Sequence, residues 1–547
     1  MVSAWVRRSG AGRPEAMAVL AVLLPVLVML AVGLWGLDRG GMWRDEGVTY
    51  QVARRSVPQI WQLLHSADAV HGLYYLLMHP VLAPHPGEVA LRLPSVCAAA
   101  ATAGLVAALG VRLCRPRVGL WAGLLYAVTP MTGHFAQEGR SYALVAAGAA
   151  AATWLLVRAM TVPPARTKPR TWGRAASRHW WAYGAAVAVT CLLHELAVLL
   201  LFAHAGTLAL ARVPARVWRA WGCAAGAVVL ALVPLALVSH AQSAQVAWLP
   251  RPGLGSVVRL LSAFTGPAWL VVVPHLVLIA LALWRPFARR GELSLQAVAL
   301  PLMVVPPALL MTVSQFWPLY DDRYVLYALA GAPLLAAAGA ERLVSLLPRL
   351  RLTVPTGARV TLIGALAVTL GFAFQLPLFR LDRTPDHGAD NLATVSATAG
   401  RELRPGDPVL FLPSIVRRSA LTYPNGFRGV RDVALSAPGP SSGTLYGQEA
   451  APSELRRRIS RLDHVWLVAE PFATRPTWTP DSPTERLKLT LVEEEFVPLQ
   501  EITRGGVTLR LYIRRPPRAP QDESALSGGH PVRQPPRGAA APYGSAP

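Results

Sequence analysis

The sequence predicts an all-α polytopic membrane bundle of about 11 helices, followed by a small α/β domain. Of its 547 residues, 53% are hydrophobic and only 15% are charged, whereas soluble domains carry roughly 25% charged residues. Apolar stretches of about 18–25 residues, long enough to cross a bilayer, recur up to residue 376. Beyond that point, short apolar runs alternate with polar segments, which is typical of a soluble domain.

Eleven apolar segments make up the predicted bundle, residues 16–376. The first is too long for a signal-peptide core of about 7–15 residues and has no small-x-small cleavage motif before Trp43, so we expect a retained helix. The fifth and sixth nearly meet at His194-Glu195, which indicates a tight turn. The segments are 16–37, 89–112, 118–132, 141–160, 180–193, 196–211, 218–238, 268–284, 296–313, 324–340 and 359–376.

The short loops predict the orientation, because Arg and Lys gather on the cytoplasmic side. With residues 1–15 as a cytoplasmic N-terminus, the inner segments contain 22 basic and three acidic residues, and the outer loops up to residue 323 are nearly balanced. This asymmetry explains much of the net charge of +23 without a nucleic-acid partner. The basic segment 158–178 is expected to face anionic membrane lipids. We therefore predict a multi-pass plasma-membrane protein.

An odd number of spans places residues 377–515 outside the cell, as an extracytoplasmic α/β domain. Short apolar runs at 407–413 and 463–469 predict buried strands, and 507–513 alternates with a period of two. From Pro516 onward the chain is rich in Pro, Gly, Ser and Arg, so residues 516–547 are expected to be a disordered tail.

Unusual ionisable residues lie at the outer ends of the predicted spans. Asp45 and Glu46 follow the first span, and carboxylates so close to hydrocarbon are costly unless they are used. Further residues of this kind are Asp68, His71, His134, Glu138, Arg140, His194, Glu195, Asp321, Asp322 and Arg323. Their gathering on one side predicts a single polar cavity there.

These residue types suit one chemistry in particular. Carboxylates can accept a proton from a hydroxyl or hold a divalent cation. Arginines bind phosphate and neutralise the charge on a departing phosphate. A hydroxyl that attacks a sugar carried on a lipid phosphate needs both functions. Nucleotide sugars are cytosolic, so a transferase on the outer face requires a lipid-linked donor.

Five stretches together resemble one family. They are Trp43-Arg-Asp-Glu, Asp68-Ala-Val-His-Gly-Leu-Tyr-Tyr, Leu91-Arg-Leu-Pro-Ser, Glu138-Gly-Arg-Ser-Tyr-Ala and Asp322-Arg-Tyr. In order and spacing they are similar to motifs of the GT-C glycosyltransferases, polytopic enzymes that use polyprenyl-phosphate sugars. The resemblance is closest to the protein O-mannosyltransferase and aminoarabinose-transferase group (glycosyltransferase family 39 and its relatives), here in a bacterial form.

The resemblance implies that Asp45 is the catalytic base, that Glu46 supports it or a metal, and that Arg140 binds the lipid phosphate. Arg323 would have a similar role. We add further candidate substrate-binding residues, which are Glu138, His71, His194 and Tyr74. The resemblance leaves open a divalent cation (Mg²⁺ or Mn²⁺) at Asp45, Glu46 and His194.

The reaction implied by the resemblance is transfer of a hexose, with mannose favoured, to a hydroxyl acceptor with inversion of configuration. The acceptor is left open between protein, lipid and glycan, because the chain lacks the inserted luminal domain of the large eukaryotic members. The partners expected are therefore a lipid-linked sugar donor, a hydroxyl acceptor and membrane lipids.

Simpler explanations exist for each site residue. Asp45 could pair with Arg44 or Arg39, Arg140 could extend to the interface beside Glu138, and Tyr74 could belong to the interfacial aromatic belt. A transporter or lipid flippase is the alternative function, but it would favour charges near the bilayer midplane and repeated broken helices. A membrane-anchored binding or scaffold protein would leave the coincidence of Asp45 and Arg140 unexplained.

Overall fold

The computed structural model describes residues 13–161, 174–284, 291–346, 356–384 and 390–516. Most of the predicted cytoplasmic N-terminus and of the predicted tail lie outside the described residues. So do Arg166, Lys168 and Arg170 of the basic inner segment.

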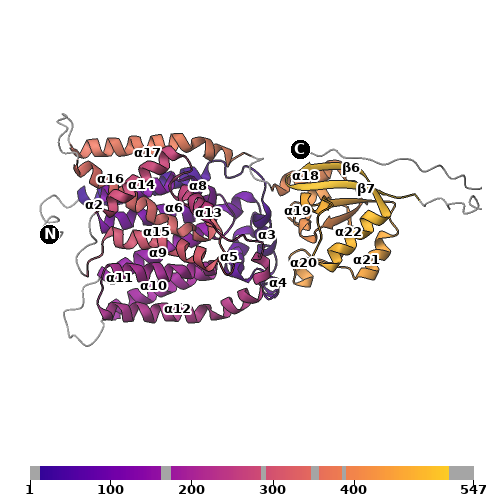
Figure 1. Ribbon diagram of the computed structural model, residues 1–547, viewed down its shortest axis with the longest axis horizontal. Helices are drawn as coiled ribbons and strands as arrows, with labels where there is room; N and C mark the ends of the chain where they lie inside the picture. Colours follow the sequence, from indigo (N-terminus) through magenta and orange to yellow (C-terminus); the bar gives the residue numbers. More distant parts are fainter. Residues whose placement is uncertain (1–12, 162–173, 285–290, 347–355, 385–389, 517–547) are drawn as a thin grey trace, which may run out of the picture.

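The first part of the chain is a bundle of helices that run side by side (Figure 1). Each of the eleven predicted spans contains a helix. The bundle consists of α2 (Arg13–Leu34), α6 (Glu88–Leu113), α7 (Pro116–Ala127), α9 (Tyr142–Thr161), α10 (Arg174–Leu193), α11 (Leu199–Leu210), α12 (Ala215–Ala241), α13 (Leu254–Thr265), α14 (Trp269–Leu283), α15 (Leu295–Val313), α16 (Gly331–Leu346) and α17 (Thr356–Leu381).

Seven helices of the described chain are long and apolar enough to cross a membrane. The pair α13 and α14, bent by 85°, would make an eighth span. Small residues bring neighbouring helices into close contact. A Cβ atom added to Gly110 of α6 would lie 2.6 Å from the Cα atom of Gly119 of α7, so these two helices meet backbone to backbone. The predicted fold class is confirmed, and the chain is a multi-pass membrane protein.

Short helices form a layer at one end of the bundle. The loop after α2 contains α3 (Arg44–Ala53), α4 (Val57–Leu64) and α5 (Gly72–Leu82), with the 3₁₀ turn η1 (Ala69–His71) before α5. The short elements of other loops are α8 (Pro130–Ala136), η2 (Glu195–Val198), η3 (Ser243–Val246) and η4 (Asp322–Ala330). Figure 1 shows α3, α4 and α5 at the end of the bundle that faces the C-terminal domain.

The C-terminal domain is built on a five-stranded sheet with the order β2-β1-β5-β7-β6. β1 is parallel to β2 and β5, whereas β7 is antiparallel to β5 and β6. The predicted strands are present as β1, β5 and β7. The strands are β1 (Pro408–Leu412), β2 (Arg431–Asp432), β3 (Leu435–Ala437), β4 (Gln448–Glu449), β5 (His464–Ala469), β6 (Phe496–Arg504) and β7 (Val507–Arg514).

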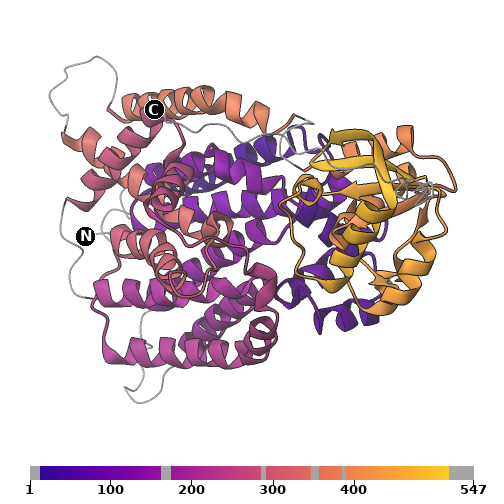
Figure 2. The ribbon, with the colours of Figure 1, turned by 45° about the vertical axis from the view of Figure 1, so that its right-hand side comes forward.

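Helices surround this sheet. They are α18 (Leu392–Glu402), α19 (Arg418–Thr422), α20 (Gly439–Ser442), α21 (Pro452–Ile459) and α22 (Pro483–Glu495), together with the 3₁₀ turns η5 (Ser414–Arg417), η6 (Pro424–Phe427) and η7 (Pro471–Thr474). β1 is buried along its whole length, as the apolar run at 407–413 predicts. Figures 1 and 2 both place the domain against the end of the bundle that carries α3.

Candidate active site

Asp45 lies in the first turn of α3, where the helix dipole favours a negative charge. Its side chain is 32% exposed, and its Oδ2 atom accepts a hydrogen bond of 3.1 Å from Nη1 of Arg323. Arg323 belongs to η4, 278 residues further along the chain. The fold therefore brings two of the predicted site residues into direct contact.

Glu46, the next residue, is 1% exposed, and its side chain contacts other residues than Asp45 does. Its Oε1 atom accepts from Nε of Arg92 at 2.8 Å and from the backbone N–H of Gly139 at 2.7 Å, and its Oε2 atom accepts from Nη2 of Arg92 at 2.8 Å. Arg92 also donates to the carbonyls of Leu37, Arg39 and Gly41. Glu46 therefore joins α3, α6 and the loop that carries Arg140.

Arg140 lies beside Asp45 and is 5% exposed. Its Nη2 atom is 2.6 Å from Nε2 of His71, and its Nη1 atom is 3.3 Å from Oγ1 of Thr49 and 3.4 Å from the Asp45 carbonyl oxygen. Its Nε atom has no hydrogen-bond partner. Within the described ranges, no carboxylate forms a salt bridge with Arg140. A buried cation without a paired anion is costly.

His71 and His194 flank Arg140 as neutral side chains. A guanidinium can only donate, so Nε2 of His71 accepts and its Nδ1 atom carries the proton. Burial, and then the Arg140 charge, lower the pKa of His71 well below its usual range. Burial together with Arg140 and Arg323 lowers the pKa of His194 to about 3. The two rings are 5.8 Å apart between centroids, and His194 is 4.8 Å from Tyr324.

Glu138 and Tyr74 complete the predicted set. Glu138 is 5% exposed, and burial raises its pKa to about 7 even though the charges of His134 and Arg323 act in the opposite direction. Tyr74 is fully buried, so it does not belong to an exposed aromatic belt. Its hydroxyl has no hydrogen-bond partner, and burial raises its pKa.

Several buried polar atoms of this cluster have no hydrogen-bond partner. They include His71 Nδ1, Tyr74 Oη, Glu138 Oε1, Arg140 Nε and His194 Nδ1. Buried polar atoms in native proteins nearly always have partners, so each such atom requires an explanation. A polar ligand held among these side chains would supply the missing partners.

Other candidates from the sequence are engaged away from this cluster. His134 pairs with Asp382, Glu195 accepts from Ser239, and Asp322 pairs with Arg259 at 2.6 Å. Asp68 accepts a hydrogen bond from the Tyr75 hydroxyl and lies 3.9 Å from His71, at the edge of the cluster.

The residues proposed for a metal do not fit one. Both carboxylate oxygens of Glu46 are occupied by Arg92 and Gly139, and Asp45 is paired with Arg323. Among the described residues, no group of three or more His, Cys, Asp and Glu side chains could hold a metal ion. The proposed set of Asp45, Glu46 and His194 is therefore not a metal site in this geometry.

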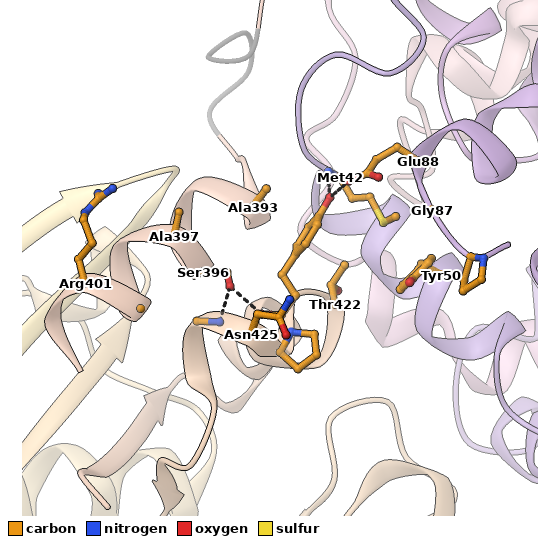
Figure 3. A pocket seen from close by; sticks show the side chains of 15 residues that line it. Met42, Tyr50, Gly87, Glu88, Ala393, Ser396, Ala397, Arg401, Thr422 and Asn425 are labelled. Carbon is orange, nitrogen blue, oxygen red and sulfur yellow. Dashed lines mark hydrogen bonds between the residues drawn. The ribbon is translucent and has the colours of Figure 1, made fainter. Parts of the chain in front are cut away.

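A cavity of about 610 Å³ lies at the joint between the two domains, apart from this cluster. Figure 3 shows Met42, Tyr50 and Glu88 on one side and α18 and η6 residues on the other. The Met42 N–H donates to the Tyr423 hydroxyl at 2.9 Å, and Tyr423 donates to Glu88. None of Asp45, Arg140 and Arg323 lines this cavity.

No family model and no curated protein matches this chain, but solved structures do. ArnT from Cupriavidus metallidurans, both in the apo state and bound to undecaprenyl phosphate, superposes with a TM-score of 0.54 at 14% identity, over 90% of this chain and 97% of ArnT. The chain has the GT-C fold of ArnT. The Archaeoglobus fulgidus oligosaccharyltransferase in complex with Zn and sulfate gives 0.50 at 12% identity, over 82% of this chain and 68% of that one. The resemblance read from the motifs is thus confirmed at the level of the fold.

Arg92 is not among the site residues that the sequence predicts, although it lies in the Leu91-Arg-Leu-Pro-Ser stretch. A single arginine inside an apolar helix is expensive and signals a buried partner. Thr49 and Gly139 carry no such signal, since their contacts depend on how α3 meets the 137–141 loop.

Proposed function

We propose that this protein transfers a hexose, with mannose as the expected sugar, from a polyprenyl-phosphate donor to a hydroxyl acceptor on the outer face of the plasma membrane, with inversion at the anomeric carbon. The observation that carries this proposal is the buried Arg140, which lies beside Asp45 and Arg323. It forms no salt bridge with any carboxylate of the described residues. A lipid phosphate is the anion that best supplies its missing partner, because guanidinium groups bind phosphate through paired hydrogen bonds. ArnT, whose fold the chain shares, binds undecaprenyl phosphate.

Asp45 is the proposed base. Its carboxylate is the most exposed of the cluster's acidic groups, so an acceptor hydroxyl can reach it, whereas Glu46 and Glu138 are buried. Arg323 holds the Asp45 carboxylate in one orientation. When a phosphate is bound, we expect Arg323 to turn its free donors toward it.

The reaction balances with these groups alone. The acceptor oxygen bonds to the anomeric carbon while the bond between that carbon and the phosphate oxygen breaks. The acceptor proton passes to Asp45, and the lipid phosphate leaves with one further negative charge. The charges of Arg140 and Arg323 oppose this charge in a site with little water, where such stabilisation is strongest. The neutral His71 and His194 can donate hydrogen bonds from Nδ1–H to phosphate or sugar oxygens.

The test is transfer of label from radiolabelled polyprenyl-phosphate mannose in membranes that contain the protein. Asp45→Asn keeps the shape of the side chain and removes the base, so we expect product to fall about 10²-fold or more. Asp38→Asn, at an exposed acid in the same loop, is the matched control. Equal product from wild type and Asp45→Asn would overturn the role of Asp45. A wild type that transfers from no polyprenyl-phosphate hexose would overturn the function.

A further inference from the structure

In the C-terminal domain, the carboxyl ends of the parallel strands β1 and β5 face α3. The chain passes from β1 to β2 on one side and later to β5 on the other, so the strand order reverses between β1 and β5. Ligands of open α/β sheets bind at such a point, outside the carboxyl ends of the strands. Here Arg418 and Ser419 follow β1, and Glu470 follows β5. Arg44, the neighbour of Asp45, donates to Glu470 at 3.0 Å.

This edge holds buried polar atoms without partners. Arg418 is 4% exposed and its Nε atom is unpaired, and the fully buried Ser419 hydroxyl is unpaired as well. The ion pairs around them are balanced, because Arg418 pairs with Glu470, and Arg44 pairs with both Glu470 and Asp390. Two cations and two anions leave no net charge, which suits an uncharged ligand rich in hydroxyl groups.

A short segment, Gly443 to Tyr446, ties this edge to the helices that carry the candidate active site. Arg55 at the end of α3 donates to the carbonyls of residues 444 and 445 at 2.9 and 3.1 Å, and Ser66 donates to the carbonyl of Gly443 at 2.9 Å. Gly443 has φ +66° and lies against Gln62, so the close approach requires glycine.

Tyr446 ends this segment between the two domains. Its ring packs against the core of the bundle, and its carbonyl accepts from Arg417 at 2.9 Å. The side chain of Arg418, the residue after Arg417, acts on the Tyr446 hydroxyl through its charge. Burial raises the pKa of Tyr446 to about 12, against the charge of Arg418, and the charges of Asp68 and Asp45 raise it further. The link from this edge to Asp45 is the hydrogen bond between Glu470 and Arg44, the residue before Asp45.

We propose that Tyr446, Arg418 and Glu470 form an acceptor subsite that holds a hydroxyl-rich, carbohydrate-like acceptor next to Asp45. The part of the Tyr446 ring that the bundle leaves exposed offers a stacking surface, the unpaired Arg418 Nε–H can donate to a sugar hydroxyl, and Glu470 can accept from one. This inference rests on the proposed transferase function. It makes the C-terminal domain part of the reaction site, with the donor phosphate bound by the bundle.

The experiment places a bulky block at the subsite. In a variant with Cys97, Cys114, Cys191 and Cys223 replaced by alanine, Tyr446→Cys is modified with a biotin maleimide. Leu499→Cys, on the exposed face of β6, is the matched control. Membranes from cells of the source organism with the gene deleted supply the natural acceptor, and labelled polyprenyl-phosphate mannose supplies the sugar. Binding of polyprenyl phosphate is measured in parallel.

We expect modification at position 446 to reduce transfer about tenfold or more while binding of polyprenyl phosphate stays within about twofold. Modification at position 499 should change neither. Full transfer by the modified 446 variant would overturn the subsite and leave the transferase function standing. Loss of lipid binding together with transfer would also overturn it, since the block would then act on the donor. A wild type without transfer would instead overturn the proposed function, and this inference with it.

A second measurement, the dependence of transfer on acceptor, separates an acceptor-binding role of Tyr446 from a purely structural one. Tyr446→Phe keeps the ring and loses the hydroxyl, so it should retain more transfer than Tyr446→Ala. Both variants should require more acceptor membrane for half-maximal transfer, at an unchanged requirement for donor. Equal dependence on acceptor in wild type and Tyr446→Ala would contradict the proposal.

Discussion

The carboxylate of Glu46 and the guanidinium of Arg92 are joined by two hydrogen bonds of 2.8 Å, almost wholly shielded from solvent. This pair fixes the first turn of α3 against α6, and through Gly139 it also fixes the loop that carries Arg140. The adjacent residues Asp45 and Glu46 therefore make different contacts. Asp45 faces the polar cluster, whereas Glu46 holds Asp45 and Arg140 in register.

Removing Glu46 should destabilise the protein. Glu46→Ala leaves Arg92 as a buried charge with only backbone partners, and breaking such a pair costs about 3–5 kcal/mol. We expect a lower melting temperature in detergent. Glu46→Leu combined with Arg92→Met should recover most of the loss, because apolar pairs of similar volume often replace buried ion pairs. Unchanged melting of Glu46→Gln with complete loss of transfer would instead identify Glu46 as a reacting group.

Arg140 should control affinity for the lipid phosphate. Arg140→Gln removes the charge and most donors, and hydrogen bonds to charged groups contribute about 1.5–3 kcal/mol. We therefore expect binding of polyprenyl phosphate to weaken about 10- to 100-fold. Arg54→Gln, an exposed arginine at the end of α3, should bind as the wild type does. Equal affinities for Arg140→Gln and Arg54→Gln would rule out Arg140 as the phosphate ligand.

Glu138 should make phosphate binding depend on pH. Burial raises its pKa to about 7 from 4.5, so the carboxyl is neutral below that pH and negative above it. The groups that act on it are His134, Arg323, Glu46 and Arg140. Ionised Glu138 repels phosphate, so affinity should fall as the pH rises through about 7, by at most about tenfold per pH unit for one proton.

The polyprenyl phosphate itself ionises near pH 6, so the comparison with Glu138→Gln isolates the effect. The ratio of the variant's affinity to that of the wild type should grow from about pH 6 to about pH 8. A constant ratio over this range would show that Glu138 does not ionise beside the phosphate.

The topology predicts which side of the membrane each loop faces. In the same cysteine-free background, an impermeant maleimide added to intact cells should label Leu499→Cys in the C-terminal domain. It should leave Arg117→Cys, at the opposite end of the bundle, unlabelled until the cells are opened. The reverse pattern would place the candidate site on the cytoplasmic side and remove the argument for a lipid-linked donor.

Much of this fold could be predicted because bilayer spans obey simple rules of length and hydropathy. All eleven apolar segments contain helices, and the runs at 407–413 and 463–469 form the parallel strands β1 and β5. The convergence of Asp45 with Arg323 followed from topology alone, since both were placed at outer span ends.

The partners of these residues could not be predicted, because they depend on tertiary packing. Nothing in the sequence pairs Glu46 with Arg92, 46 residues away, rather than with a metal. The same holds for the segment from Gly443 to Tyr446, whose backbone is bound by Arg55 and Ser66. Long-range contacts of this kind leave no periodic pattern.

The most direct test of this account is an experimental structure of the protein with bound polyprenyl phosphate. We predict that the phosphate lies between Arg140 and Arg323, that Nε of Arg140 gains an oxygen partner, and that Asp45 is released from Arg323 toward the acceptor side. A phosphate bound elsewhere, with Arg140 still on His71 and Asp45 still on Arg323, would contradict the proposed site.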